Sequence, residues 1–154
     1  MEHILDFLTN PYLLTGLGSW FIAQVLKTII YAIINKEIRW ERLFGDGGMP
    51  SGHSATVTSL AIFAGLRCGF HSFEFAAAAV FAIVVCHDAM GVRLETGKQA
   101  EIINELVEAF ERISKEKVAE EKLKIFVGHT PIQVLAGITI GAVNALLMNL
   151  ILPW

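Results

Sequence analysis

The sequence predicts an all-α membrane protein: a polytopic bundle of about four transmembrane helices with an amphipathic helical segment on the cytoplasmic side. Hydrophobic residues make up 54% of the chain and charged residues only 18%. The mean hydropathy of +0.55 is too high for an ordinary soluble domain. Most charges also gather in residues 36–46 and 93–124 and leave long apolar stretches nearly free of them. This segregation is typical of a chain that crosses a bilayer.

Four apolar stretches are long enough to cross a bilayer, which takes roughly 20 residues of helix. They cover residues 12–35, 54–70, 73–92 and 131–152. The second is the shortest and contains Arg67, so its end is expected to break early or tilt. Gly69, His71 and Ser72 predict a tight turn that makes the second and third spans an antiparallel hairpin. The length favours one domain, residues 1–154.

Residues 94–124 are rich in Glu and Lys, with apolar residues at nearly helical spacing. These residues are Ile102, Leu106, Phe110, Ile113 and Val118. The pattern predicts an amphipathic helix with a break near Ser114. Three placements stay open for it: flat on the membrane surface, as a cap on the bundle, or paired with another chain. If the helix pairs with a second copy of this chain, the protein is a homo-oligomer.

The basic residues predict the orientation in the membrane. Four spans put both long loops on one side and both termini on the other. Ten of the twelve Lys and Arg residues fall in those two loops, Arg67 lies on the opposite side, and Lys27 lies within the first span. The positive-inside rule then places the loops in the cytoplasm and both termini outside. No part of this charge pattern resembles a nucleic-acid surface.

Residues 47–54 read GGMPSGHS and stand immediately before the second span. Glycines with Pro and Ser ahead of a helix offer backbone N–H groups at the positive end of the helix dipole, which suits a phosphate group. A plain loop with a helix N-cap is the alternative. His53 adds a candidate acid to this segment.

Residues 128–131 read GHTP before the fourth span and repeat the arrangement of a Gly, a His and a helix start. Alone, His129 would more often be structural. Two histidines at two helix N-termini on one face of the membrane instead favour a nucleophile and its acid partner.

Lys27 lies eight residues before the end of the first span, about 12 Å deep, which is too far for easy snorkelling. Gln24, Lys27, Tyr31 and Asn35 form one polar stripe at helical spacing. A charge at that depth is expensive unless it faces a polar interior. The stripe is therefore expected to face the interior of the bundle.

Residues 87–93 read HDAMGVR at the cytoplasmic end of the third span. Asp88 and Arg93 are five residues apart, so on a continuous helix they would not share a face. Gly91 is a place where the helix can break and let Arg93 turn inward. Arg93 is then either half of a simple ion pair or a bidentate phosphate donor.

Gly137, Gly141 and Ala145 form a small-xxx-small pattern in the fourth span. Such patterns favour close packing of helices, either within the bundle or between subunits.

Together these residues resemble a known family. The MPSGHS segment at 49–54 resembles the Pro-Ser-Gly-His box of the type 2 phosphatidic acid phosphatases, which share a core with vanadium-dependent haloperoxidases. The wider pattern resembles the divergent branch of that superfamily and covers most of the chain outside the termini and residues 105–122. The matching pieces are Gln24, Lys27, Arg39, residues 47–55, 88–93 and 97–101, Asn104 and residues 128–131.

The resemblance implies a helical-bundle phosphatase that hydrolyses a lipid or prenyl phosphomonoester through a phosphohistidine, with no metal or cofactor. In that mechanism His129 would be the nucleophile, and His53 would be the general acid that protonates the leaving oxygen. The phosphate-binding set would be Lys27, Arg39, Arg93 and the backbone of Ser51 and Gly52.

Several features depart from the family's usual pattern, and two of them concern the nucleophile. An Asp four residues after the nucleophile normally orients it, and here that position is Gln133, which accepts a hydrogen bond but supplies no charge. The usual Ser-Arg pair before the nucleophile is replaced by Lys122-Leu123. Arg93 must then supply the missing guanidinium, supported by Asp88.

Two other functions stay open. The first is metal-dependent phosphatidyl-group transfer or phosphatase activity, for which the oxygen ligands would be Asp88, Glu95, Glu101 and Asn104. The second is a non-catalytic membrane protein that binds a lipid phosphate, and Gln133 is the feature that motivates it.

Overall fold

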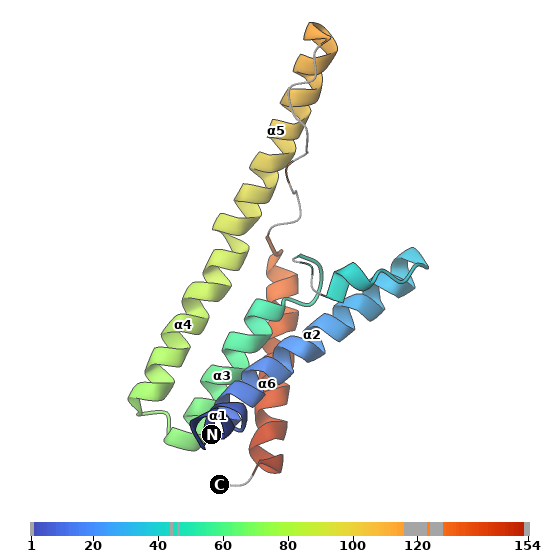
Figure 1. Cartoon of the computed structure of the whole chain (residues 1–154). Coiled ribbons are helices and arrows are strands. Elements are labelled where there is room, and N and C mark those ends of the chain that lie inside the picture. The colour runs from blue at the N-terminus through green and yellow to red at the C-terminus, as the bar shows by residue number, and fades with distance from the viewer. Residues whose placement is uncertain (1, 44, 46, 116–122, 124–127, 153–154) are drawn as a thin grey trace.

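The computed structural model describes residues 2–43, 45, 47–115, 123 and 128–152, and every regular element among them is helical (Figure 1). The helices are α1 (Glu2–Leu8), α2 (Pro11–Asn35), the 3₁₀ turn η1 (Trp40–Leu43), α3 (Gly52–Cys68), α4 (Phe73–Met90), α5 (Val92–Ser114) and α6 (Pro131–Ile151). The prediction of an all-α membrane bundle is confirmed. The short helix α1 was not predicted.

Helix α3 lies at the centre of the bundle and packs against α2, α4 and α6 (Figure 1). Its sequence is rich in Ser, Thr, Ala and Gly, and small side chains let neighbouring helices approach closely. Phe63, Ala55 and Ser59 on this helix are fully buried. The central helix therefore meets protein on most of its surface, while the outer helices present apolar side chains to the surroundings.

Helix α6 lies against α3 through two glycines. A Cβ atom added to Gly137 would meet the carbonyl oxygen of Ser51, and one added to Gly141 would meet the carbonyl oxygen of Ala55. Only glycine permits such an approach of two backbones. The small-residue pattern in this span therefore serves packing within the bundle.

Three described helical stretches are long and apolar enough to span a membrane. They are Pro11–Asn35, Pro131–Ile151 and the combined run Phe73–Ser114. Helix α3, the second of the four predicted spans, has 17 residues, or about 26 Å at 1.5 Å per residue. It begins at Gly52 and ends at Cys68, where the predicted turn follows: Ser72 N–H donates to the Gly69 carbonyl at 3.1 Å.

Helices α4 and α5 together form one long rod, and α5 projects beyond the rest of the bundle (Figure 1). Among the described helices α5 packs only against α4, so it does not cap the bundle, which was one of the placements left open. The helix ends at Ser114, where the break was predicted, and Lys115 follows in the left-handed conformation at φ 59°. Within the predicted segment 94–124, residues 116–122 and 124 lie outside the described residues.

A buried polar network joins α2 to α6. Asn144 Nδ2 donates to the Thr15 carbonyl at 3.1 Å and to Ser19 Oγ at 2.7 Å, and all three residues are buried. Polar side chains at membrane depth need such protein partners. The sequence analysis did not single out Asn144, although an amide in an otherwise apolar span was the available signal.

Replacing Gly141 with Ala should destabilise the protein, because the new methyl group meets the α3 backbone. Overpacking of this kind typically costs about 1–3 kcal/mol. Gly18→Ala is the matched control, since its Cβ would meet nothing closer than Asn144 Nδ2 at 3.8 Å and Ala favours helix over Gly. Thermal unfolding in detergent should show a lower Tm for the first variant only. Equal melting temperatures would contradict the close packing of α3 on α6.

Candidate active site

The segment before α3 is a cap that positions His53. Gly47 and Gly48 have φ values of 78° and 81°, a backbone conformation that favours glycine. Ser51 is the N-cap of α3: its hydroxyl accepts from Ser54 N–H at 3.3 Å and from the Ser54 hydroxyl at 3.0 Å. Both serines are fully buried. This cap fixes the first turn of α3, where His53 is the second residue.

Two backbone hydrogen bonds hold the start of α6, one to this cap and one to α4. Ser51 N–H donates to the Gln133 carbonyl at 3.0 Å, and His129 N–H donates to the Ala89 carbonyl of α4 at 3.0 Å. Gly128 lies directly on the backbone of Arg93 and Leu94, and a Cβ there would overlap with it. The N-termini of α3 and α6 are therefore held side by side, next to the junction of α4 and α5.

The two histidines face each other as a result. The centroids of the His53 and His129 rings are 6.1 Å apart, and the ring planes are inclined by 57°. His129 is 2% exposed, while His53 is half-buried. Each imidazole stands near the N-terminus of a helix, where the dipole carries roughly half a positive charge and favours anions.

Lys27 and Gln24 lie on α2 and are both 5% exposed. Lys27 Nζ donates to the Gly45 carbonyl at 3.2 Å, and its side chain lies against Gly48. The Gln24 side chain lies beside Gly52, and its buried Oε1 accepts no hydrogen bond from the described residues. The polar stripe thus faces the interior only as far as Lys27, because Asn35 further along α2 is exposed.

Arg93 forms an ion pair with Asp88. Its Nε lies 2.8 Å from Asp88 Oδ2, and each side chain is 42% exposed. The expectation that these residues would not share a face holds only for a continuous helix. Gly91, with φ −100° and ψ −92°, interrupts the helix between α4 and α5, so the two side chains meet. The backbone contact with Gly128 places this pair beside the segment that leads to His129.

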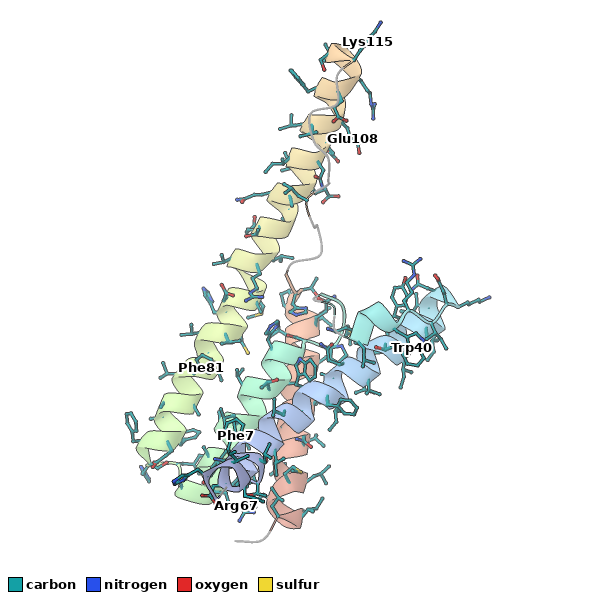
Figure 2. The ribbon with its side chains drawn as sticks, viewed as in Figure 1. Phe7, Trp40, Arg67, Phe81, Glu108 and Lys115 are labelled. Atoms are coloured by element: carbon teal, nitrogen blue, oxygen red, sulfur yellow. The ribbon has the colours of Figure 1, made fainter. Side chains whose placement is uncertain are left out.

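Arg39 lies in the connection between α2 and η1 and pairs with Glu37 at 3.2 Å, with its side chain 52% exposed. Helix α2 diverges from the bundle toward this end, and the neighbouring Trp40 lies at its outer tip (Figure 2). The structure therefore does not bring Arg39 to the histidine pair. The sequence analysis assigned Arg39 to the phosphate-binding set from its position in the family's motif. A motif does not show in which direction the chain runs after α2.

Two comparisons with known proteins support the resemblance. The model of the divergent PAP2 family matches residues 8–144 of the chain. The chain belongs to the divergent PAP2 family. It is also 38% identical over 159 aligned residues to the uncharacterized membrane protein YuiD of Bacillus subtilis (strain 168), covering 97% of this chain and 98% of that protein. No solved structure matches it.

Gln133 of this divergent PAP2 protein is occupied as a helix cap. Its Oε1 accepts from Thr130 N–H at 3.0 Å, and together these residues form a capping box at the start of α6. Its backbone carbonyl accepts from Ser51, as described above. The supporting role predicted for Gln133, orientation of the His129 imidazole, stays a prediction, while its structural role is to fix the turn next to that imidazole.

Three of the four residues considered as metal ligands have other partners. Glu95 pairs with Lys98 at 2.7 Å, and Asp88 pairs with Arg93. The Asn104 side chain exchanges two hydrogen bonds of 2.9 Å with the backbone of Leu123. Within the part of the chain that the structure describes, no three His, Cys, Asp or Glu residues gather as a metal site would require.

Trp20 is a site residue that the sequence analysis missed. Its indole lies against Gly52, within 3.3 Å of the position a Cβ would take. It stands four residues before Gln24, on the same face of α2, so the spacing of the polar stripe could have indicated it.

Gln133→Ala should destabilise the protein, since loss of a helix N-terminal cap typically costs about 0.5–2 kcal/mol. Gln133→Glu is the matched variant, because Glu at this position preserves the capping box and adds a favourable charge at the helix N-terminus. Thermal unfolding should therefore rank the Ala variant lowest and leave the Glu variant near the wild type. Equal loss in both would contradict the capping role.

Proposed function

We propose that this protein hydrolyses a lipid or prenyl phosphomonoester at the cytoplasmic surface of the membrane through a phosphohistidine intermediate. The observation that supports it most is the pair of histidine rings 6.1 Å apart at the N-termini of α3 and α6. In-line attack needs the nucleophile roughly 3–3.5 Å from phosphorus, and the acid about 2.6–3.2 Å from the leaving oxygen. In that arrangement the phosphorus and its ester oxygen lie between the two reacting nitrogens, so the nitrogens must be further apart than either of these distances. Imidazole rings whose centroids are 6.1 Å apart can flank a phosphate ester in this way.

In the first step an imidazole nitrogen of His129 forms a bond to phosphorus. The bond between phosphorus and the alcohol oxygen breaks, and its electron pair goes to that oxygen, which takes a proton from the His53 imidazolium. In the second step a water molecule attacks phosphorus and gives a proton to His53. The P–N bond breaks, its electrons return to His129, and inorganic phosphate leaves.

The charges around the pair suit a phosphate. Lys27 is buried in the bundle with its ammonium group against the loop that precedes α3. The first N–H groups of a helix lack intrahelical acceptors, and Gly52 is the first residue of α3. Arg93 can exchange Asp88 for phosphate at small cost, because partly exposed ion pairs are worth little.

Ser51 and Gln24 have different parts in this proposal. Ser51 was predicted to bind phosphate through its backbone, but its N–H is committed to the Gln133 carbonyl, so Ser51 holds the two helix starts together and Gly52 is the remaining donor. Gln24 Oε1 is a buried acceptor beside Gly52 and is suited to a hydroxyl of the phosphate or to the attacking water.

Removal of His129 should abolish phosphate release. His53→Ala should retain some activity, because general acid catalysis typically contributes about 10²–10⁴-fold. Purified protein in detergent would be assayed with phosphatidic acid, phosphatidylglycerol phosphate and prenyl phosphates, with and without EDTA. EDTA should leave the rate unchanged. His71→Ala, in the turn at the opposite end of α3, is the matched control and should behave as wild type.

The same assay separates the alternative in which the site binds lipid phosphate without turnover. The commitment of the Gln133 side chain to a helix cap favours that alternative, since the position at which the family has an orienting Asp is here an amide bonded to Thr130. Phosphate release that does not exceed the His129→Ala background with any substrate would refute the phosphatase proposal. Loss of activity with EDTA would favour the metal-dependent reaction.

The proposal needs the histidine side of the bundle to be cytoplasmic. A cysteine at Lys115, at the far end of α5 (Figure 2), should resist membrane-impermeant thiol reagents in intact cells once Cys68 and Cys86 are replaced. A cysteine at His71, in the turn at the other side, should react readily. The reverse pattern of labelling would overturn the orientation.

A further inference from the structure

An apolar groove of about 440 Å³ opens between α2, α3 and α4. Helices α2 and α4 both pack on α3, but among the described residues they do not contact each other, and Figure 1 shows them diverging on either side of it. The walls are mostly hydrocarbon and aromatic side chains: Leu17 and Trp20 from α2, Val57 from α3, and Phe81 and Val85 from α4.

His53 is the titratable residue in the lining of this groove. Thr56 also borders it, but its hydroxyl donates to the Gly52 carbonyl at 2.8 Å. The groove is therefore a hydrocarbon surface that ends at the proposed general acid. A volume of this size lies within the range of about 300–1,000 Å³ that is typical of ligand pockets.

The groove runs from the histidine pair toward the middle of the spans. On α4, Phe81 lies nine residues before Met90, or about 14 Å at 1.5 Å per residue. Figure 2 places Phe81 well below the junction with α5. A hydrocarbon chain that lies in this groove therefore stays in apolar surroundings from Phe81 as far as His53.

We propose that this groove binds one hydrocarbon chain of the substrate and thereby presents its phosphate ester oxygen to His53. The proposal rests on the phosphatase function argued above and specifies its substrate class: a monoester whose alcohol is a single linear chain. Each methylene buried in the groove should strengthen binding about fourfold until the groove is filled.

A second apolar groove supplies the matched control. It has a volume of about 270 Å³, lies between α2 and α6, and is lined by Ile22, Val143 and Leu147 among others. Its amide, Asn144, is already bonded to Thr15 and Ser19, and no histidine borders it. Filling this second groove should not affect a hydrocarbon chain bound in the first groove next to His53.

The kinetic test compares Leu17→Trp, which fills the first groove, with Val143→Trp, which fills the second. Both side chains are more than half exposed, so the larger residue can be accommodated. Leu17→Trp should lower kcat/KM at least tenfold for a long-chain prenyl monophosphate and leave p-nitrophenyl phosphate unchanged. Val143→Trp should leave both rates unchanged. Equal effects of the two variants would contradict the proposal that this groove binds the hydrocarbon chain of the substrate. Activity that does not depend on the length of that chain would also contradict it.

A binding test keeps this inference separate from catalysis. With Trp40 and Trp154 replaced by Phe, the fluorescence of Trp20 reports the groove. A brominated single-chain alkyl phosphate should quench it at least twofold more than brominated phosphatidylcholine at the same mole fraction. In a Trp20→Phe, Val143→Trp protein that difference should vanish. Selective quenching without turnover would support binding of the hydrocarbon chain in the groove and refute the phosphatase function. Turnover with equal quenching by the two lipids would refute only binding of the chain in the groove.

Discussion

The close approach of α6 to α3 determines the geometry of the site. It depends on Gly137 and Gly141, where the two backbones leave no room for a side chain. Only at this separation can Ser51 at the start of α3 donate to the Gln133 carbonyl in the first turn of α6. That bond puts two helix N-termini side by side and brings His53 within 6.1 Å of His129 between ring centroids. This backbone hydrogen bond fixes the relative position of the two helix starts directly, in addition to the packing of their side chains.

The central position of α3 has a second consequence. Because α3 separates α2 from α4, these two helices diverge, and the apolar groove opens between them with His53 at its border. The same divergence takes the end of α2 away from the bundle, so Lys27 is buried while residues further along, such as Asn35 and Arg39, are exposed. The packing that assembles the histidine pair thus also buries Lys27 against the loop that precedes α3.

Local patterns in the sequence were enough to predict much of this arrangement. The length of the apolar stretches predicted the helices α2, α3, α4 and α6. The Gly-His pairs predicted that both histidines lie at helix starts, and the depth of Lys27 in its span predicted that it is buried. Each of these properties follows from neighbours along the chain. The exposed position of Arg39 could not be predicted, because the direction of the chain after α2 depends on tertiary packing. The Asp88–Arg93 ion pair was one of the two alternatives left open for Arg93, and the backbone angles at Gly91 allow it. The spacing of Thr130 and Gln133 matches a capping box, which the sequence analysis did not single out.

The engagement of Gln133 bears on how His129 would act as a nucleophile. The imidazole becomes positive when its nitrogen bonds to phosphorus, and a carboxylate behind it would stabilise that charge, which an amide cannot do. In the proposed mechanism the phosphoryl oxygens would supply negative charge next to that imidazolium. The same oxygens would bind Lys27 and the N-terminus of α3, so binding of phosphate and stabilisation of the imidazolium would draw on the same negative charge. Such a site would favour a good leaving group and a well-positioned acid, which is the role proposed for His53.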